Sequence, residues 1–171
     1  MACDMRAVEF PQMSGDSMSR NRVNKHCPED QRPARVLVVD DLPASRLLLY
    51  RVFSALKYDV SLAADGEEAW YLMVSRQPFD IVLTDLEMPA LDGLQLAQRI
   101  RKSGRDEIRD RPVIIHSSTD PAQLRDPIAA DPLTFCLPKP LEVGRLKETL
   151  VKIQEAVSGA ADSTSIKLPP F

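Results

Sequence analysis

Apolar and polar positions in the middle of the chain form blocks that predict alternating strands and helices. Three short runs are continuous and rich in β-branched residues, which is typical of parallel strands buried on both faces: VLVV (36–39), IVL (81–83) and VII (113–115). Two further runs favour edge strands, because YDVSLAA (58–64) alternates in polarity and LTFCL (133–137) runs into prolines.

Between these runs, apolar residues recur at the three- and four-residue steps of amphipathic helices. The stripes are Leu49, Val52, Phe53 and Leu56; Ala69, Leu72 and Met73; Gly93, Leu96, Ala97 and Ile100; and Val143, Leu146, Leu150, Ile153 and Val157. The alternation predicts an α/β fold with a doubly wound, five-stranded parallel sheet of order 2-1-3-4-5 and helices on both faces. Ligands bind such sheets outside the carboxyl ends of the strands, beside the first and third.

The composition and charge of the chain argue against several classes of protein. The 171 residues carry a formal net charge of −3, which gives no basic footprint for nucleic acid and no polybasic anchor for a membrane. The first residues lack the apolar segment of a secretory signal, and the three cysteines have no metal-type spacing, so we expect a cytoplasmic protein with reduced thiols. We expect a disordered extension over 1–33, one domain over 34–157 and a flexible tail over 158–171.

Charged and polar side chains follow four of the five predicted strands. Asp40 and Asp41 follow the first strand, Asp85 the third, Ser117 the fourth and Lys139 the fifth. Three carboxylates at one edge of a sheet repel each other unless a cation lies among them, and a hard divalent ion such as Mg²⁺ suits these ligands. Asp85 could then be a nucleophile towards a phosphoryl group, whose oxygens Lys139 and the Ser117 hydroxyl would contact.

Each of these residues alone has an ordinary explanation, as a solvated turn, a helix cap or a loop. Their arrival at successive strand ends of one sheet is what favours a site. A phosphatase of the haloacid dehalogenase type would place its Asp-x-Asp after the first strand, whereas DLE here follows the third. A nucleotide-binding protein would need a glycine-rich loop after the first strand, where two acids stand instead.

The segment from about Arg35 to Val157 resembles the receiver domain of bacterial two-component response regulators. The motifs that carry the resemblance are VLVVDD, DIVLTDLEMPALDG, PVIIHSS and LPKP. The resemblance implies a flavodoxin-like receiver fold. It also implies a phosphoprotein that takes its phosphoryl group from a sensor histidine kinase or phosphotransfer protein. Such a protein promotes its own phosphorylation and dephosphorylation without being an enzyme, and signals to a downstream protein target.

The resemblance also implies roles for single residues. Asp85 would accept the phosphoryl group; Asp41 and Asp85 would ligate Mg²⁺ directly, Asp40 through water, and the Glu87 backbone carbonyl would complete the protein ligands.

Two further roles follow from the same resemblance. Ser117 would take the place of the switch hydroxyl and Lys139 that of the lysine that contacts phosphate. The Lys139–Pro140 bond corresponds to one that is commonly cis in the family.

The sequence departs from the family pattern in two places. Cys136 stands where the family has a Tyr or Phe that moves with the switch hydroxyl, and Phe135 should point to the opposite face of its strand. The predicted fourth helix, TDPAQLRDPIAADPL, contains Asp-Pro three times, and Pro127 should shorten or break it. A receiver-like interaction module that works without phosphorylation is the main alternative, although no acid or lysine of the pattern is missing. Fewer than 20 residues follow Val157, which favours a stand-alone receiver.

Overall fold

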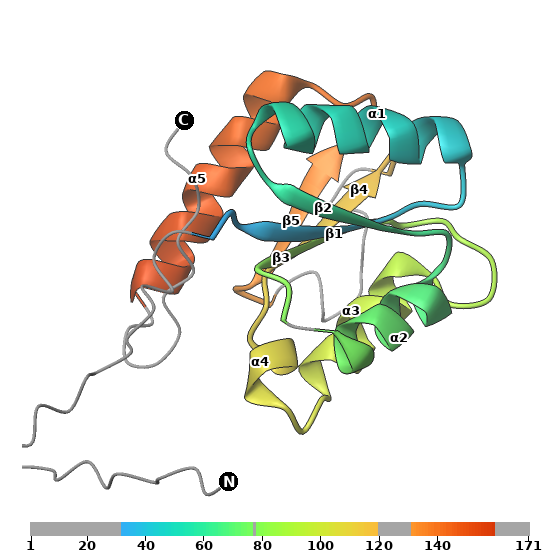
Figure 1. The fold of residues 1–171 in the computed structure, drawn as a ribbon, viewed down its shortest axis with the longest axis vertical. Helices are drawn as coiled ribbons and strands as arrows, with labels where there is room; N and C mark the ends of the chain where they lie inside the picture. Colours follow the sequence, from blue (N-terminus) through green and yellow to red (C-terminus); the bar gives the residue numbers. More distant parts are fainter. Residues whose placement is uncertain (1–31, 77, 120–130, 160–171) are drawn as a thin grey trace, which may run out of the picture.

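Five parallel strands form one sheet in the order β2-β1-β3-β4-β5, as the sequence predicts (Figure 1). The computed structural model describes residues 32–76, 78–119 and 131–159. The strands are β1 (Arg35–Val39), β2 (Asp59–Ala63), β3 (Ile81–Asp85), β4 (Val113–Ser117) and β5 (Thr134–Pro138). Each apolar run in the sequence is therefore a strand, and the two predicted edge strands lie at the edges.

Helices cover both faces of this sheet, with α1 and α5 on one face and α2 and α3 on the other (Figure 1). Their bounds are α1 (Pro43–Ala55), α2 (Gly66–Ser75), α3 (Gly93–Arg101), α4 (Asp106–Arg109) and α5 (Val143–Gly159). None of the helices within the described ranges is long and apolar enough to cross a membrane.

The local sequence explains where α2 and α3 begin. The Asp65 side chain accepts a hydrogen bond from the backbone N–H of Glu68 at 2.8 Å, and Asp92 forms a reciprocal capping box with Gln95. Such caps satisfy N–H groups that have no partner inside the helix and are worth about 1 kcal/mol each.

The sheet separates two apolar cores, and alternate strand residues supply them. In β1, Val36 and Val38 enter the core under α1 and α5, while Leu37 and Val39 enter the core under α2 and α3. This two-sided burial is why the central strands read as continuous apolar runs.

Two details differ from the sequence-based expectation. Val143 belongs to the predicted apolar stripe but is 46% exposed, and it is the first residue of α5. The short helix α4 has too few residues to produce a periodic pattern, and the sequence analysis did not predict it. Most of the predicted helix over 119–132 lies outside the described residues, as do residues 1–31 and 160–171.

A glycine at the start of α3 sets how closely this helix approaches the end of β3. A Cβ atom built on Gly93 would meet the Asp85 carbonyl oxygen closer than real Cβ atoms come, whereas one on Gly104 would meet nothing within 4 Å. We expect Gly93→Ala to lower the free energy of unfolding by about 1–3 kcal/mol in urea denaturation, because backbone must shift. Gly104→Ala is the matched control and should be neutral within about 0.5 kcal/mol. Equal effects of the two substitutions would contradict this explanation.

Candidate functional site

Three carboxylates meet at the carboxyl end of the two central strands. Val39 of β1 pairs with Thr84 of β3, so Asp40 and Asp41 leave the sheet beside Asp85. One carboxylate oxygen of each aspartate lies within 4.8 Å of the other two. The geometry therefore brings together the three acids predicted from the sequence. A set of hard oxygen ligands at this spacing fits Mg²⁺ or a similar divalent cation.

The surrounding chain holds Asp40 in place. Asp40 is fully buried; its Oδ1 accepts the backbone N–H of Leu42 at 2.9 Å, and its Oδ2 accepts the hydroxyl of Ser45 at 2.6 Å. Arg46 also donates to the Asp40 carbonyl oxygen. These three contacts come from the first residues after β1, and the sequence analysis did not predict them. Both Asp40 oxygens are thus engaged by the segment that follows β1.

Lys139 supplies the positive charge of the site. Its Nζ lies 2.7 Å from Oδ2 of Asp85, and the Lys139–Pro140 peptide bond is cis. The Lys139 backbone N–H donates to the Ser117 carbonyl at 2.8 Å, which continues the pairing of β4 with β5 beyond the strands. The lysine is thus aimed at the acid cluster by the sheet itself.

Ser117 and Glu87 lie at the border of the cluster. Ser117 is 4% exposed, and its hydroxyl oxygen accepts the backbone N–H of Thr119 at 2.8 Å. Glu87 is exposed on the turn after β3, and its N–H donates to Oδ1 of Asp85 at 3.4 Å. In this structure the Ser117 hydroxyl is therefore engaged by the backbone of the segment that directly follows β4.

His116 is a feature of the site that the sequence analysis missed. It pairs in register with Asp85 and is 4% exposed, yet both ring nitrogens lack a hydrogen-bond partner among the described residues. Burial is the largest cause that lowers the pKa of His116 below 6.5, and the Lys139 charge adds to it, against the opposing charges of Asp85 and Asp40. The sequence does contain a feature that could have revealed this residue, because a histidine interrupts the apolar run of the strand directly before Ser117.

The strand alternation at β5 agrees with the sequence analysis. Phe135 packs against the core under α1 and α5, and Cys136 is half-buried on the other side of the strand. Burial raises the pKa of the Cys136 thiol above its ordinary value. A small side chain therefore stands at the position where the family has a ring.

Comparison with known proteins shows which family shares this arrangement. Residues 36–151 match the family model of the response regulator receiver domain. The chain belongs to this family. The resemblance read from VLVVDD, DIVLTDLEMPALDG, PVIIHSS and LPKP is thereby confirmed.

The receiver is similar to parts of larger signalling proteins. It is 35% identical over 134 residues to the sensor histidine kinase RcsC of Escherichia coli K12, which covers 78% of this chain and 14% of that protein. It is 34% identical over 137 residues to the response regulator MprA of Mycolicibacterium vanbaalenii, covering 78% of this chain and 57% of that protein. The chain thus spans only part of either relative.

Solved structures show the same fold over nearly their whole length. TrrA from Thermotoga maritima, solved in complex with Mg²⁺-BeF, is 33% identical with a TM-score of 0.60, and the match covers 70% of this chain and 98% of that one. The chemotaxis regulator CheY4 of Vibrio cholerae is 26% identical with a TM-score of 0.62, over 71% and 98%.

Repulsion within the acid cluster generates a prediction for the metal-free protein. We expect Asp41→Asn to be as stable as wild type without Mg²⁺, or more stable by up to about 1 kcal/mol, because one of three neighbouring negative charges is removed. Mg²⁺ should raise the melting temperature of wild type and of the control Glu155→Gln, but not of Asp41→Asn. Undiminished stabilisation of Asp41→Asn by Mg²⁺ would count against this residue as a ligand.

The unpartnered imidazole generates a second prediction. His116→Leu should raise the free energy of unfolding by about 1–3 kcal/mol at neutral pH, because it removes buried polar atoms without partners. Because the His116 pKa is lowered in the folded protein, the unfolded chain binds a proton at this residue at higher pH than the folded chain does. The free energy of unfolding of wild type should therefore fall as the pH drops below 6.5. That loss should be shallower in His116→Leu, and urea denaturation across this pH range measures it. A less stable variant with an unchanged pH profile would refute the explanation.

Proposed function

We propose that this receiver takes a phosphoryl group from a sensor histidine kinase or a phosphotransfer protein onto Asp85, and that the reaction requires Mg²⁺. The observation that carries the proposal is the meeting of three carboxylates within 4.8 Å, with Lys139 at 2.7 Å from Asp85. The similarity to a sensor kinase and to a response regulator supports partners of this class.

The described residues fit the expected metal. Asp41 and Asp85 would bind Mg²⁺ directly, Asp40 through water, and the Glu87 carbonyl would complete the protein ligands. When bound, the ion neutralises carboxylate charge and draws phosphoryl oxygens into the site. The hydrogen bonds from Leu42 and Ser45 hold the Asp40 side chain in one orientation before any ligand arrives.

The transfer is a displacement at phosphorus. A carboxylate oxygen of Asp85 attacks the phosphoryl group of a phosphohistidine whose other ring nitrogen carries a proton. The phosphorus–nitrogen bond breaks, its electron pair stays on the nitrogen, and the donor leaves as neutral imidazole. Asp85 becomes an acyl phosphate and loses its negative charge on the attacking oxygen. Lys139 then pairs with a phosphoryl oxygen in place of the Asp85 carboxylate. The Ser117 hydroxyl leaves the Thr119 N–H and donates to a second phosphoryl oxygen. Both contacts stabilise the product by charge and hydrogen bonding. Hydrolysis of the acyl phosphate by water releases inorganic phosphate and restores the Asp85 carboxylate.

The main alternative is a receiver-like module that acts without phosphorylation. Such a module would have no use for buried acids that repel one another. Asp40 is fully buried and Asp85 is 4% exposed, an arrangement that costs stability unless a cation is to be bound. The phosphoacceptor function is therefore favoured.

The output of the phosphorylated state is expected to be a changed protein–protein contact. Cys136 is too small to act as a moving ring, so we expect the signal to pass through the segment 119–132 and not through β5. Most of that segment lies outside the described residues, and this expectation stays a prediction.

Mass spectrometry of the intact protein tests the proposed function. With acetyl phosphate and Mg²⁺, wild type should gain the mass of one phosphoryl group and lose it slowly in water. Asp85→Asn should keep the fold, but the fraction of the protein that gains the phosphoryl mass should be at least about tenfold lower, since the amide is a poor nucleophile. Asp59→Asn, which removes an exposed carboxylate from β2, should behave as wild type. Undiminished labelling of Asp85→Asn would refute the assignment.

A further inference from the structure

The outer edge of β2 is open. Within the described ranges this strand lies at one end of the sheet and pairs with β1 alone. The backbone N–H of Asp59 donates to the carbonyl of Ala34, directly before β1, and every second residue after Asp59 faces β1 in the same way. The N–H and C=O groups of Val60 and Leu62 therefore point away from the sheet.

The backbone groups on either side of this open stretch already have partners. The N–H of Tyr58 donates to the Phe53 carbonyl at 3.0 Å, and the N–H of Ala64 donates to the Glu68 carboxylate at 2.7 Å. For the two outward residues between them, no hydrogen bond is found among the described residues outside the β1–β2 ladder. The open edge is thus a short stretch with both a donor and an acceptor on each of two residues.

The side chains at this edge are apolar. Val60 packs at the border of the core under α1 and α5, and Leu62, two residues further along the same face, is 39% exposed. Natural proteins commonly protect an edge strand with lysine, another charged residue or proline. The charged residue of β2 is Asp59, whose carboxylate lies 3.6 Å from Nε of Arg35 on the neighbouring strand. An open apolar edge of this kind is typical of a surface to which another strand is added.

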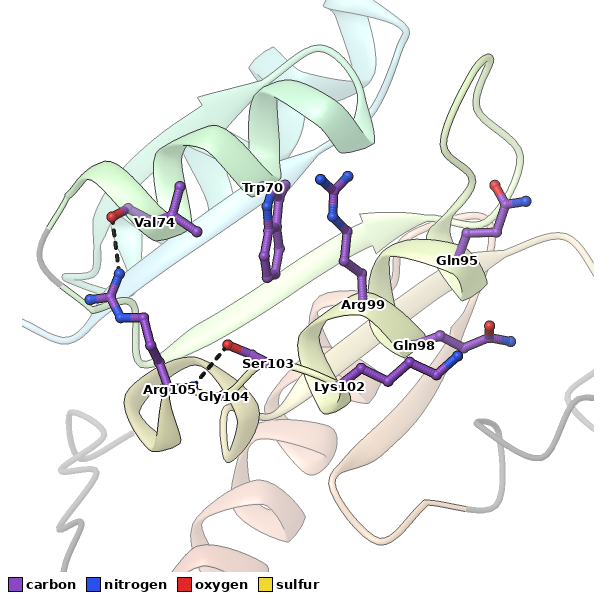
Figure 2. Close-up of a pocket in the computed structure, with 9 residues that line it drawn as sticks. All are labelled: Trp70, Val74, Gln95, Gln98, Arg99, Lys102, Ser103, Gly104 and Arg105. Atoms are coloured by element: carbon purple, nitrogen blue, oxygen red, sulfur yellow. Dashed lines mark hydrogen bonds between the residues drawn. The ribbon is translucent and has the colours of Figure 1, made fainter.

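The helix beside this edge is held in place by α3. α2 packs against β2 on the sheet face that it shares with α3. The Arg99 guanidinium lies 4.7 Å from the centroid of the Trp70 ring, and it bonds both oxygens of Glu67. Arg105 donates to the Val74 carbonyl at 3.0 Å (Figure 2). The edge is therefore preformed, and a second strand can pair with it without a rearrangement of α2.

One register of antiparallel pairing between two copies satisfies every open backbone group. With Ser61 on a two-fold axis, Val60 of each copy lies opposite Leu62 of the other, and each such pair exchanges both backbone hydrogen bonds. Moving the axis by one residue would set an open residue against Tyr58 or Ala64, whose N–H groups are already bonded. The open edge thus fits a second copy of the chain in a single register.

The charges at the two ends of β2 agree with this register. Lys57 is exposed before the strand, and Asp65 follows the strand at the start of α2. Both residues are equally far from Ser61, so antiparallel pairing brings the lysine of each copy towards the aspartate of the other. Asp59 comes opposite Ala63, so the carboxylates of the two strands do not meet. Opposite charges across paired strands stabilise the pairing, and like charges oppose it.

We propose that two copies of this chain pair edge to edge through β2 and form one continuous sheet. The backbone bonds and side-chain contacts between Val60 and Leu62, and the pairing of Lys57 with Asp65, hold the seam, each of them twice by symmetry. Antiparallel pairing points the carboxyl ends of the two sheets in opposite directions, so both acid clusters stay open. The dimer does not depend on the proposed phosphoacceptor function, and Asp85→Asn should form it equally well.

Sedimentation equilibrium of the full chain over a range of concentrations tests for the dimer. Leu62→Lys should raise its dissociation constant by at least about tenfold, because a charge replaces an apolar contact at the seam. Lys57→Glu should also weaken the dimer. The matched controls on α5, Val151→Lys and Lys152→Glu, should leave it unchanged. All four side chains are exposed in the single chain, so these variants should fold as wild type does, which their melting temperatures check.

Disulfide cross-linking tests the register. The background is the full chain with its three native cysteines replaced by alanine. Ser61→Cys should cross-link two copies on mild oxidation, because the Cα atoms of a pair that is not hydrogen-bonded lie about 4.5 Å apart, within disulfide reach. Asp59→Cys is the matched control and should not cross-link, because the two copies of this residue would be about 14 Å apart along the seam.

Three results would overturn the proposal. One is a monomer at every concentration. Another is a dimer that Leu62→Lys weakens no more than Val151→Lys does, which would show that the copies meet through a different face. The third is cross-linking of Asp59→Cys as efficient as that of Ser61→Cys, which would show that the strands do not pair in this register.

Discussion

Mutual repulsion among three carboxylates is the constraint on which the rest of the site depends. Parallel strands bring their carboxyl ends to one edge, so the register of β1 with β3 forces Asp40 and Asp41 beside Asp85. Lys139, delivered from the end of β5, opposes that repulsion through its ion pair with Asp85. In the proposed function, a divalent cation would relieve the remaining repulsion, and the energy of that repulsion would then contribute to the affinity for the cation.

The two apolar cores are what make this arrangement rigid. Central strands buried on both faces leave no freedom to slip by one residue, because a slip would turn every core side chain to the wrong face. The fixed register in turn fixes the four strand ends. Gly93 extends the same rigidity to α3, which contacts the Asp85 carbonyl directly.

The sequence predicted the features that depend on local pattern. The strand order, the edge strands and the gathering of Asp40, Asp41, Asp85 and Lys139 follow from apolar runs and from the topology that they impose. Features that depend on tertiary detail were beyond it. The hydrogen bond of Ser45 to Asp40 and the packing of Arg99 on Trp70 join residues whose sequence neighbours carry no distinctive pattern. Val143 continues the apolar period of α5 but is exposed at the first residue of the helix, which periodicity alone does not reveal.

His116 is the buried residue of β4 that departs from the apolar pattern of the strand. An imidazole in a central strand breaks the apolar run of β4, and in the structure it has neither solvent nor a hydrogen-bond partner among the described residues. A fold selected for stability alone would place leucine or valine there. The residue stands between the strand that carries Asp85 and the strand that leads to Lys139, in register with Asp85. An imidazole in register with Asp85 makes the interior beside the acid cluster less apolar than a leucine would, which lowers the cost of burying the Asp85 carboxylate.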